Sequence, residues 1–187
     1  MQPFFLAPRP SADALELVRS RAEVPLWLPD PMPVGWVVSG VGHAGDERTG
    51  ARATLLACSG PAPLGGPADL VLVAEEPAVG LGARFSGLSA ADPGPEIGTG
   101  PPAGKLTAAG HLTPLWSVHS PPNRAAFAGE ALALWLWVVL WPANAALLLL
   151  EDLELSDLRE GQLAELVTLG APSPRLAEPP AGEAAAP

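Results

Sequence analysis

One cysteine and three histidines are the residues of this chain best suited to nucleophilic catalysis. Cys58 closes an apolar run, 53–58, where the end of a strand could present a thiol. A catalytic cysteine needs a nearby base that raises its thiolate fraction, and His43, His111 and His119 are the imidazoles available. Cys58 is therefore a catalytic candidate, but a cysteine inside an apolar strand is more often an inert core residue, and that is the alternative. These four residues lack the paired spacings of zinc sites, and no metal site is predicted.

Adjacent carboxylates are the second group whose chemistry the sequence offers. Such pairs can bind a hard cation or act as general acid and general base. Asp46 and Glu75 are the catalytic candidates among them. The commoner role of paired carboxylates at strand ends is solvated charge that keeps sheet edges from pairing with other chains. The pairs are Asp46-Glu47, Glu75-Glu76 and Glu151-Asp152.

Residues 40–45 spell G-x-G-x-x-G after a candidate strand, which is the pattern of a dinucleotide-binding turn. That site needs a helix to begin there, so that its N-terminal amides face the pyrophosphate. Residues 46–51 instead read as a polar turn into another strand, and no acidic residue closes a second strand about twenty positions later. We therefore expect the glycines to permit a bulge or a close approach of backbone, and we predict no cofactor.

Three of the six tryptophans, Trp27, Trp36 and Trp116, lie beside proline-rich stretches. Aromatic side chains near prolines can line a groove that binds an extended peptide. We treat these three residues as a candidate partner groove, although tryptophans are more often core residues than ligand platforms.

Composition and charge exclude several partners. The 187 residues (19.1 kDa), 48% of them apolar, suffice for one domain with a buried core. Twenty acidic against ten basic residues give a net charge of -10, and Lys105 is the single lysine, so no binding to nucleic acid or to an anionic membrane surface is expected. A single cysteine allows no internal disulfide, and residues 1–8 lack the charged start and long apolar stretch of a signal peptide. We expect a cytoplasmic protein.

Residues 131–150 form an uncharged tract that is long enough to span a bilayer. Within it, apolar residues of both parities alternate over 134–141, as in a strand buried on both faces. Pro142 and Asn144 then favour a turn, and acidic residues flank the tract where a membrane span carries positive charge. We predict a buried hairpin of strands 134–141 and 146–151, with a buried helix and a membrane span as alternatives.

Short apolar runs separated by polar turns predict a mostly antiparallel sheet. Runs at 36–39, 53–58 and 70–74 follow one another without a helix-sized crossover, which favours antiparallel pairing. Further strands are expected at 106–109, 115–118 and 166–169, and helices or helical turns at 12–19, 77–88 and 156–160.

The expected fold class is therefore α+β, with a central buried hairpin and a few short helices. We place the single domain at residues 12–170. Residues 1–11 are expected to form an extended lead-in, and residues 171–187 a disordered tail rich in Pro and Ala.

Several strings, specific in combination, cover about residues 12–176. They are Pro33-Val34-Gly35-Trp36, Ala57–Gly66, Gly80–Phe85, Phe127–Leu132, Trp135-Leu136-Trp137, Trp141-Pro142, Asp157-Leu158-Arg159 and Ser173–Leu176. In these strings the chain resembles a family of uncharacterised actinobacterial proteins, and the resemblance implies no established activity and no catalytic residues. Longer members look as if they begin with a zinc ribbon of paired cysteines, which this chain lacks through a misplaced start or a real loss. Some relatives carry the label phosphotransacetylase, for which this sequence offers no phosphate loop.

Two functions remain open from the sequence. The first is a domain that binds a protein or a small ligand without catalysis, which we prefer because no catalytic constellation is assembled. The alternative is an enzyme, such as an acyl or phosphoryl transferase or a hydrolase, that uses Cys58 or the paired carboxylates. A deep pocket that gathers Cys58 with a histidine, or Glu75 with Asp46, would favour the enzyme.

Overall fold

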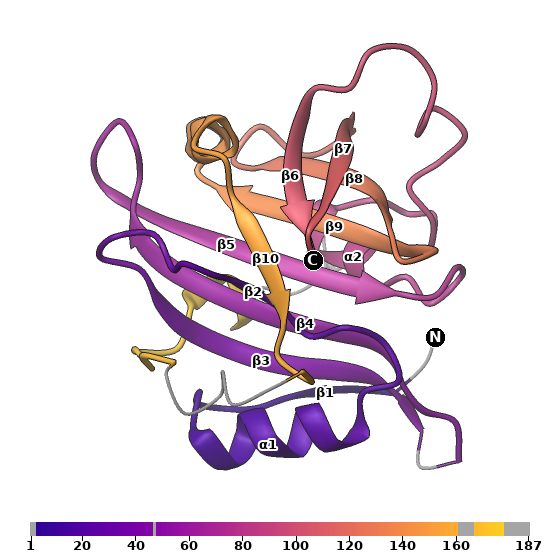
Figure 1. The fold of residues 1–187 in the computed structure, drawn as a ribbon, viewed down its shortest axis with the longest axis vertical. Coiled ribbons are helices and arrows are strands. Elements are labelled where there is room, and N and C mark those ends of the chain that lie inside the picture. The colour runs from indigo at the N-terminus through magenta and orange to yellow at the C-terminus, as the bar shows by residue number, and fades with distance from the viewer. Residues whose placement is uncertain (1–2, 47, 161–166, 178–187) are drawn as a thin grey trace, which may run out of the picture.

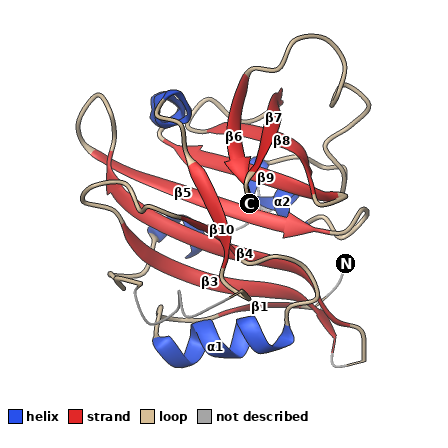
Figure 2. Ribbon diagram, viewed as in Figure 1, coloured by secondary structure: helices blue, strands red, loops and turns tan. Residues whose placement is uncertain are grey.

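Ten strands form one sheet in the computed structural model, which describes residues 3–46, 48–160 and 167–177 (Figures 1 and 2). In chain order the strands are β1 (Phe4–Leu6), β2 (Trp27–Pro29), β3 (Val37–Asp46), β4 (Gly50–Pro61), β5 (Pro67–Glu75), β6 (Gly104–Ala108), β7 (His111–Val118), β8 (Ala125–Ala131), β9 (Leu134–Trp141) and β10 (Glu154–Asp157). The helices are α1 (Ala12–Arg21), α2 (Leu81–Ser86) and the 3₁₀ helices η1 (Ala143–Leu150) and η3 (Pro174–Ala177).

The order of strands across the sheet is β1-β3-β4-β5-β9-β8-β7-β6-β10-β2. Every neighbouring pair is antiparallel except β6 and β10. The sheet curls, so that β10 and β2 lie across the face of β4 and β5 (Figure 1). The predicted α+β class with a mostly antiparallel sheet is confirmed.

The first half of the chain follows its sequence pattern closely. The predicted strand at 36–39 covers the start of β3, and those at 53–58 and 70–74 are the central parts of β4 and β5; the three strands pair in that order. The predicted helix at 12–19 is α1, and the hydroxyl of Ser11 caps it by accepting a hydrogen bond from the Ala14 N–H at 3.0 Å.

The strand at 134–141 is confirmed as β9, and it is buried on both faces. Leu136, Val138 and Leu140 face one apolar core, whereas Trp137, Val139 and Trp141 face a second. Because both parities are apolar, β9 can occupy the middle of the sheet, between β5 and β8.

The prediction that residues 146–151 form the second strand of a hairpin is wrong. Residues 143–150 form η1, because this Ala/Leu-rich segment contains no β-branched residue and Pro142 cannot donate to a ladder. The partner of β9 is instead β8, and the two are joined by Leu132 and Ala133 at φ 55 and 62. This turn contains none of the glycine or asparagine that usually marks such a hairpin.

Two further expectations near the C-terminus are met only in part. The predicted capped turn at 156–160 is present from Asp157, whose carbonyl accepts from the Glu160 N–H and whose carboxylate accepts from the Arg159 N–H, both at 3.0 Å. Ser156 and Asp157, however, also end β10, where they pair with β2. Of the strand predicted at 166–169, residue 166 lies outside the described residues, and Leu169 makes only an isolated bridge to Val38.

Both chain ends contribute to the sheet. Part of the expected lead-in is β1, which pairs with β3. Residues 171–177, which the sequence placed in a disordered tail, instead include η3 and contact the sheet through Ser173, Arg175 and Leu176. Residues 178–187 lie outside the described part of the chain. None of the described helices has the length and apolar character needed to cross a bilayer.

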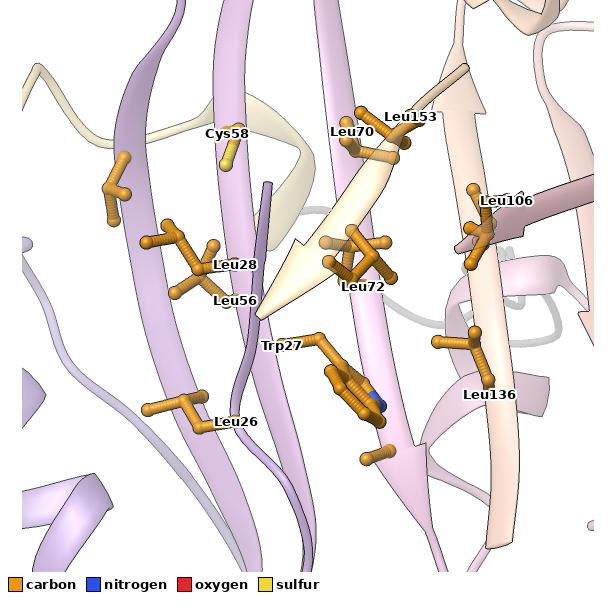
Figure 3. Close-up of a cluster of buried hydrophobic side chains, with 14 of the residues drawn as sticks. Leu26, Trp27, Leu28, Leu56, Cys58, Leu70, Leu72, Leu106, Leu136 and Leu153 are labelled. Carbon is orange, nitrogen blue, oxygen red and sulfur yellow. The ribbon is translucent and has the colours of Figure 1, made fainter. Parts of the chain in front are cut away.

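The inner core lies between the β10–β2 end of the curled sheet and strands β4 and β5 (Figure 3). Trp27 and Leu28 of β2 pack onto Leu56 of β4 and Leu72 of β5, and Cys58 extends the same layer. The outer core covers the opposite face with α2 and with Leu176. The segment that follows β2 lies at the surface beside this core, and it forms part of the site described next.

Candidate functional site

Cys58 lies in β4, and its side chain is fully buried in the inner core (Figure 3). It is a free thiol, and burial raises its pKa far above the ordinary value. No hydrogen bond joins it to an imidazole among the described residues: both ring nitrogens of His43 are unpartnered, and His111 and His119 are exposed. The geometry gives the thiol no base and no access to substrate.

Glu75 is buried at the end of β5, beneath α2. Its Oε2 accepts hydrogen bonds from the backbone N–H groups of Leu81 at 2.7 Å and Gly82 at 3.3 Å. Burial raises the pKa of this carboxyl to about 7, against the lowering effect of those two N–H groups. The indole of Trp137 also lowers the pKa, although its N–H does not reach hydrogen-bond geometry. Glu75 thus anchors α2 to the sheet, and it lines none of the hollows described below.

Asp46 and His43 do share a hollow, of about 760 Å³, at the end of β3. A bulge next to Gly45 shifts the alternation of the strand and brings the two residues to the same side. Asp46 Oδ1 accepts hydrogen bonds from the Thr49 N–H at 2.8 Å, the Thr49 hydroxyl and the Arg48 N–H, which lower the pKa of Asp46. His43 is 6% exposed, its ring nitrogens are buried, and burial lowers its pKa. This hollow does not gather Cys58 or Glu75.

The glycines of the 40–45 motif allow close packing, as the sequence predicted, rather than binding a phosphate. A side chain at Gly40 would collide with Leu176, and one at Gly42 would lie 2.6 Å from the carbonyl oxygen of Phe5 in β1. Gly45 has a φ of 152 at the bulge. The motif continues as a strand and turn, without the helix that a dinucleotide site needs.

The three candidate groove tryptophans are not brought together. Trp27 is 2% exposed inside the inner core, and Trp116 lies in β7, where its indole N–H donates to the Gly100 carbonyl at 3.3 Å. Trp36 lines two hollows at the surface, although its side chain is only 5% exposed and belongs to the inner core. The predicted groove therefore reduces to the surroundings of Trp36.

Residues 32–36 form a ridge that we call the Trp36 ridge. The Trp36 N–H donates to the Pro33 carbonyl at 3.0 Å across a tight turn, and Gly35 has the φ of 80 that the third position of a type II turn requires. Val34 occupies the tip and is 96% exposed. Trp36 packs so closely over Gly60 that a side chain there would collide with the indole. The ridge is thus a fixed turn with an apolar tip.

Two hollows flank this ridge and share Met32, Pro33, Val34 and Trp36 as lining residues. The first, of about 530 Å³, is completed by other prolines and by the segment that joins η1 to β10. The second, of about 300 Å³, is completed by residues 28–30 and 167–168. Prolines and other apolar residues are the majority of the residues that line both hollows.

Carboxylates border both hollows. Glu151, Asp152 and Glu154 line the first, and Asp30 lines the second. No lysine or arginine is among the described residues that line either one. The acidic pair at 151–152, which the sequence analysis read as solvated charge, thus lies at the rim of an apolar depression.

Sequence reasoning missed a buried polar cluster around Asp69. The hydroxyls of Ser59 and Ser173 donate to Asp69 Oδ1 at 2.6 and 2.9 Å, and Arg175 pairs with Oδ2 at 3.3 Å. Residues 59 and 173 are too far apart in the sequence for any spacing rule to reveal this contact. The cluster holds the C-terminal segment against the sheet.

Comparisons with known proteins place most of the chain in a family of unknown function. A family model described as a family of unknown function, DUF6758, matches residues 1–176. No curated protein and no solved structure matches the chain. Within the described residues, no three His, Cys, Asp or Glu side chains lie close enough to hold a metal ion.

Proposed function

The chain belongs to the DUF6758 family, and from the geometry above we propose that it is a non-catalytic domain that binds a partner at the Trp36 ridge. The observation that carries this proposal is Val34, which is 96% exposed at the tip of a rigid turn between two hollows. The fixed backbone keeps this apolar side chain in water, so covering it with a partner lowers the free energy of the system.

The candidate catalytic residues support binding rather than chemistry. Cys58 and Glu75 are both buried, and neither lines the hollow that Asp46 shares with His43. An acyl or phosphoryl transferase or a hydrolase would need a nucleophile, its base and a substrate cavity in contact with one another. The phosphotransacetylase label of some relatives gains no support from the Trp36 ridge, since carboxylates and not arginines border its hollows.

The proposal includes a compartment and an origin. We place the protein in the cytoplasm, which the single free thiol supports. Nine arginines against the single lysine, together with many Ala, Gly and Pro residues, suit a GC-rich genome. The actinobacterial source that we propose is what the resemblance in sequence strings implies. The net charge of -10 argues against nucleic acid as the partner.

A comparison of capture by two matched variants tests the binding site. Val34→Glu places a charge at the tip of the ridge, and Leu112→Glu places the same charge at another apolar residue, 67% exposed on β7. We expect a partner that wild-type protein captures from a native lysate to be reduced about tenfold or more by V34E and to be unchanged by L112E. Equal capture by wild type and V34E would exclude the Trp36 ridge as the binding surface.

A further inference from the structure

We infer that the partner segment of the Trp36 ridge is a stretch of another protein in which a large apolar side chain lies next to lysine or arginine residues. This inference rests on the proposed function and adds the chemistry of the partner.

The shape of the first hollow requires the apolar part of such a segment. Its volume of about 530 Å³ lies within the range of roughly 300–1,000 Å³ in which proteins hold ligand groups. Leu148 and Leu153 are buried beneath it, and Met32 and Trp36 form its side toward the ridge. An aliphatic or aromatic side chain that enters here exchanges water contact for contact with these four residues.

The rim of the hollow requires the charged part. Glu151, Asp152 and Glu154 are exposed, and none of them forms an ion pair with a described residue. Three uncompensated carboxylates at one edge create a negative potential that attracts cations and repels acidic chains. Lysine or arginine next to the inserted apolar residue would lie over this rim.

Charge also argues against a second copy of the chain as the occupant. Each copy carries a net charge of -10, and a symmetric contact through the ridge would bring the same three carboxylates of both copies together. Like charges opposed in this way are destabilising. A cationic segment of a different protein is therefore the occupant that the geometry favours.

A peptide array tests the inference. Each large apolar residue type is placed in turn at the centre of a short peptide and flanked by Arg and Lys, by Glu, or by Ser; a fourth set keeps the basic flanks and has Gly at the centre. We expect binding above background in the set that has both an apolar centre and basic flanks. Binding of the acidic or neutral set at equal strength, or of no set at all, would overturn the inference.

Removing the rim charges then tests their role. In the variant E151Q/D152N/E154Q, the best array peptide and the partner captured from lysate should bind about tenfold more weakly, and raising NaCl from about 0.1 M to about 0.5 M should weaken binding to wild type more than to the variant. Asn tolerates the φ of 44 that the backbone has at position 152, so the turn should persist. The control, D13N/E96Q/E130Q, removes three exposed carboxylates elsewhere and should leave affinity unchanged.

The outcomes separate the two proposals. If V34E abolishes capture of a partner while the rim variant binds it with unchanged affinity and salt dependence, the Trp36 ridge is the binding surface and the cationic inference is wrong. If neither V34E nor the rim variant alters capture, the proposed function itself fails.

Discussion

Glu75 is expected to make the protein less stable as the pH rises through neutrality. The carboxyl is buried, and its pKa changes from an ordinary value of 4.5 in the unfolded chain to about 7 in the folded protein. Between these two values the folded state retains a proton that the unfolded state has lost, so the free energy of unfolding decreases with increasing pH. The full effect is about 3 kcal/mol, and it is present below pH 4.5 and lost above about pH 7.

Urea denaturation of wild type and Glu75→Gln at several pH values measures this effect, with fluorescence of the buried tryptophans as the signal. Gln can still accept the N–H groups of Leu81 and Gly82 through its amide oxygen, but it does not titrate. Between pH 4.5 and 8, wild type should lose about 3 kcal/mol more stability than E75Q. Exposed Glu130→Gln, a matched control, should follow wild type.

Groups whose pKa is lowered in the folded state, such as Asp46, change stability in the opposite direction. They are common to wild type and E75Q, so the difference between the two curves isolates Glu75. Identical pH dependence in the two proteins would refute the claim that burial controls this carboxyl.

Two further predictions concern packing. Cys58 should not react with a soluble disulfide reagent in the native protein at pH 8 and should react fully in denaturant, because its thiol is buried and its pKa is raised. The reaction is followed by absorbance, and rapid labelling of the native protein would contradict the burial of the thiol. Gly82→Ala should lower the free energy of unfolding, measured by urea titration, by about 1–3 kcal/mol, because a side chain there would collide with the indole of Trp137. The control Gly110→Ala lies in open space at the β6–β7 turn with φ 78, so it should lower the free energy of unfolding only by the backbone strain of roughly 1 kcal/mol.

The parts of the fold that sequence predicts are those whose local pattern and final environment agree. Ser11 precedes an amphipathic run and caps α1. Residues 134–141 are apolar at both odd and even positions, which predicts the observed strand with an apolar core on each side. In both cases the residues needed for the element lie within a few positions of each other.

The parts that sequence does not predict depend on distant residues. The β8–β9 turn lacks glycine, so its positive φ values at Leu132 and Ala133 follow from strand pairing and not from local preference. Ser156 and Asp157 look like the start of a capped turn in isolation, and they also end a strand because β2 lies beside them.

The candidate site shows the same division. Trp36 was already a candidate because it lies beside prolines, but the sequence does not reveal that acidic residues of the 151–154 segment border the same hollow. It also could not separate Trp36, which lines the two hollows, from Trp27, which does not, since both side chains are buried in the inner core.

The closure of the sheet by β10 and β2 has a consequence for synthesis on the ribosome. The backbone N–H of Leu26 donates to the carboxylate of Asp157 at 3.0 Å, across 131 positions of sequence. Until residue 157 leaves the exit tunnel, β2 has no strand beside it, and the inner leucines of β4 and β5 lack their cover. Most of the polypeptide must therefore be made before this layer can close, and nascent chains that stop short of β10 expose an apolar surface to chaperones and to aggregation.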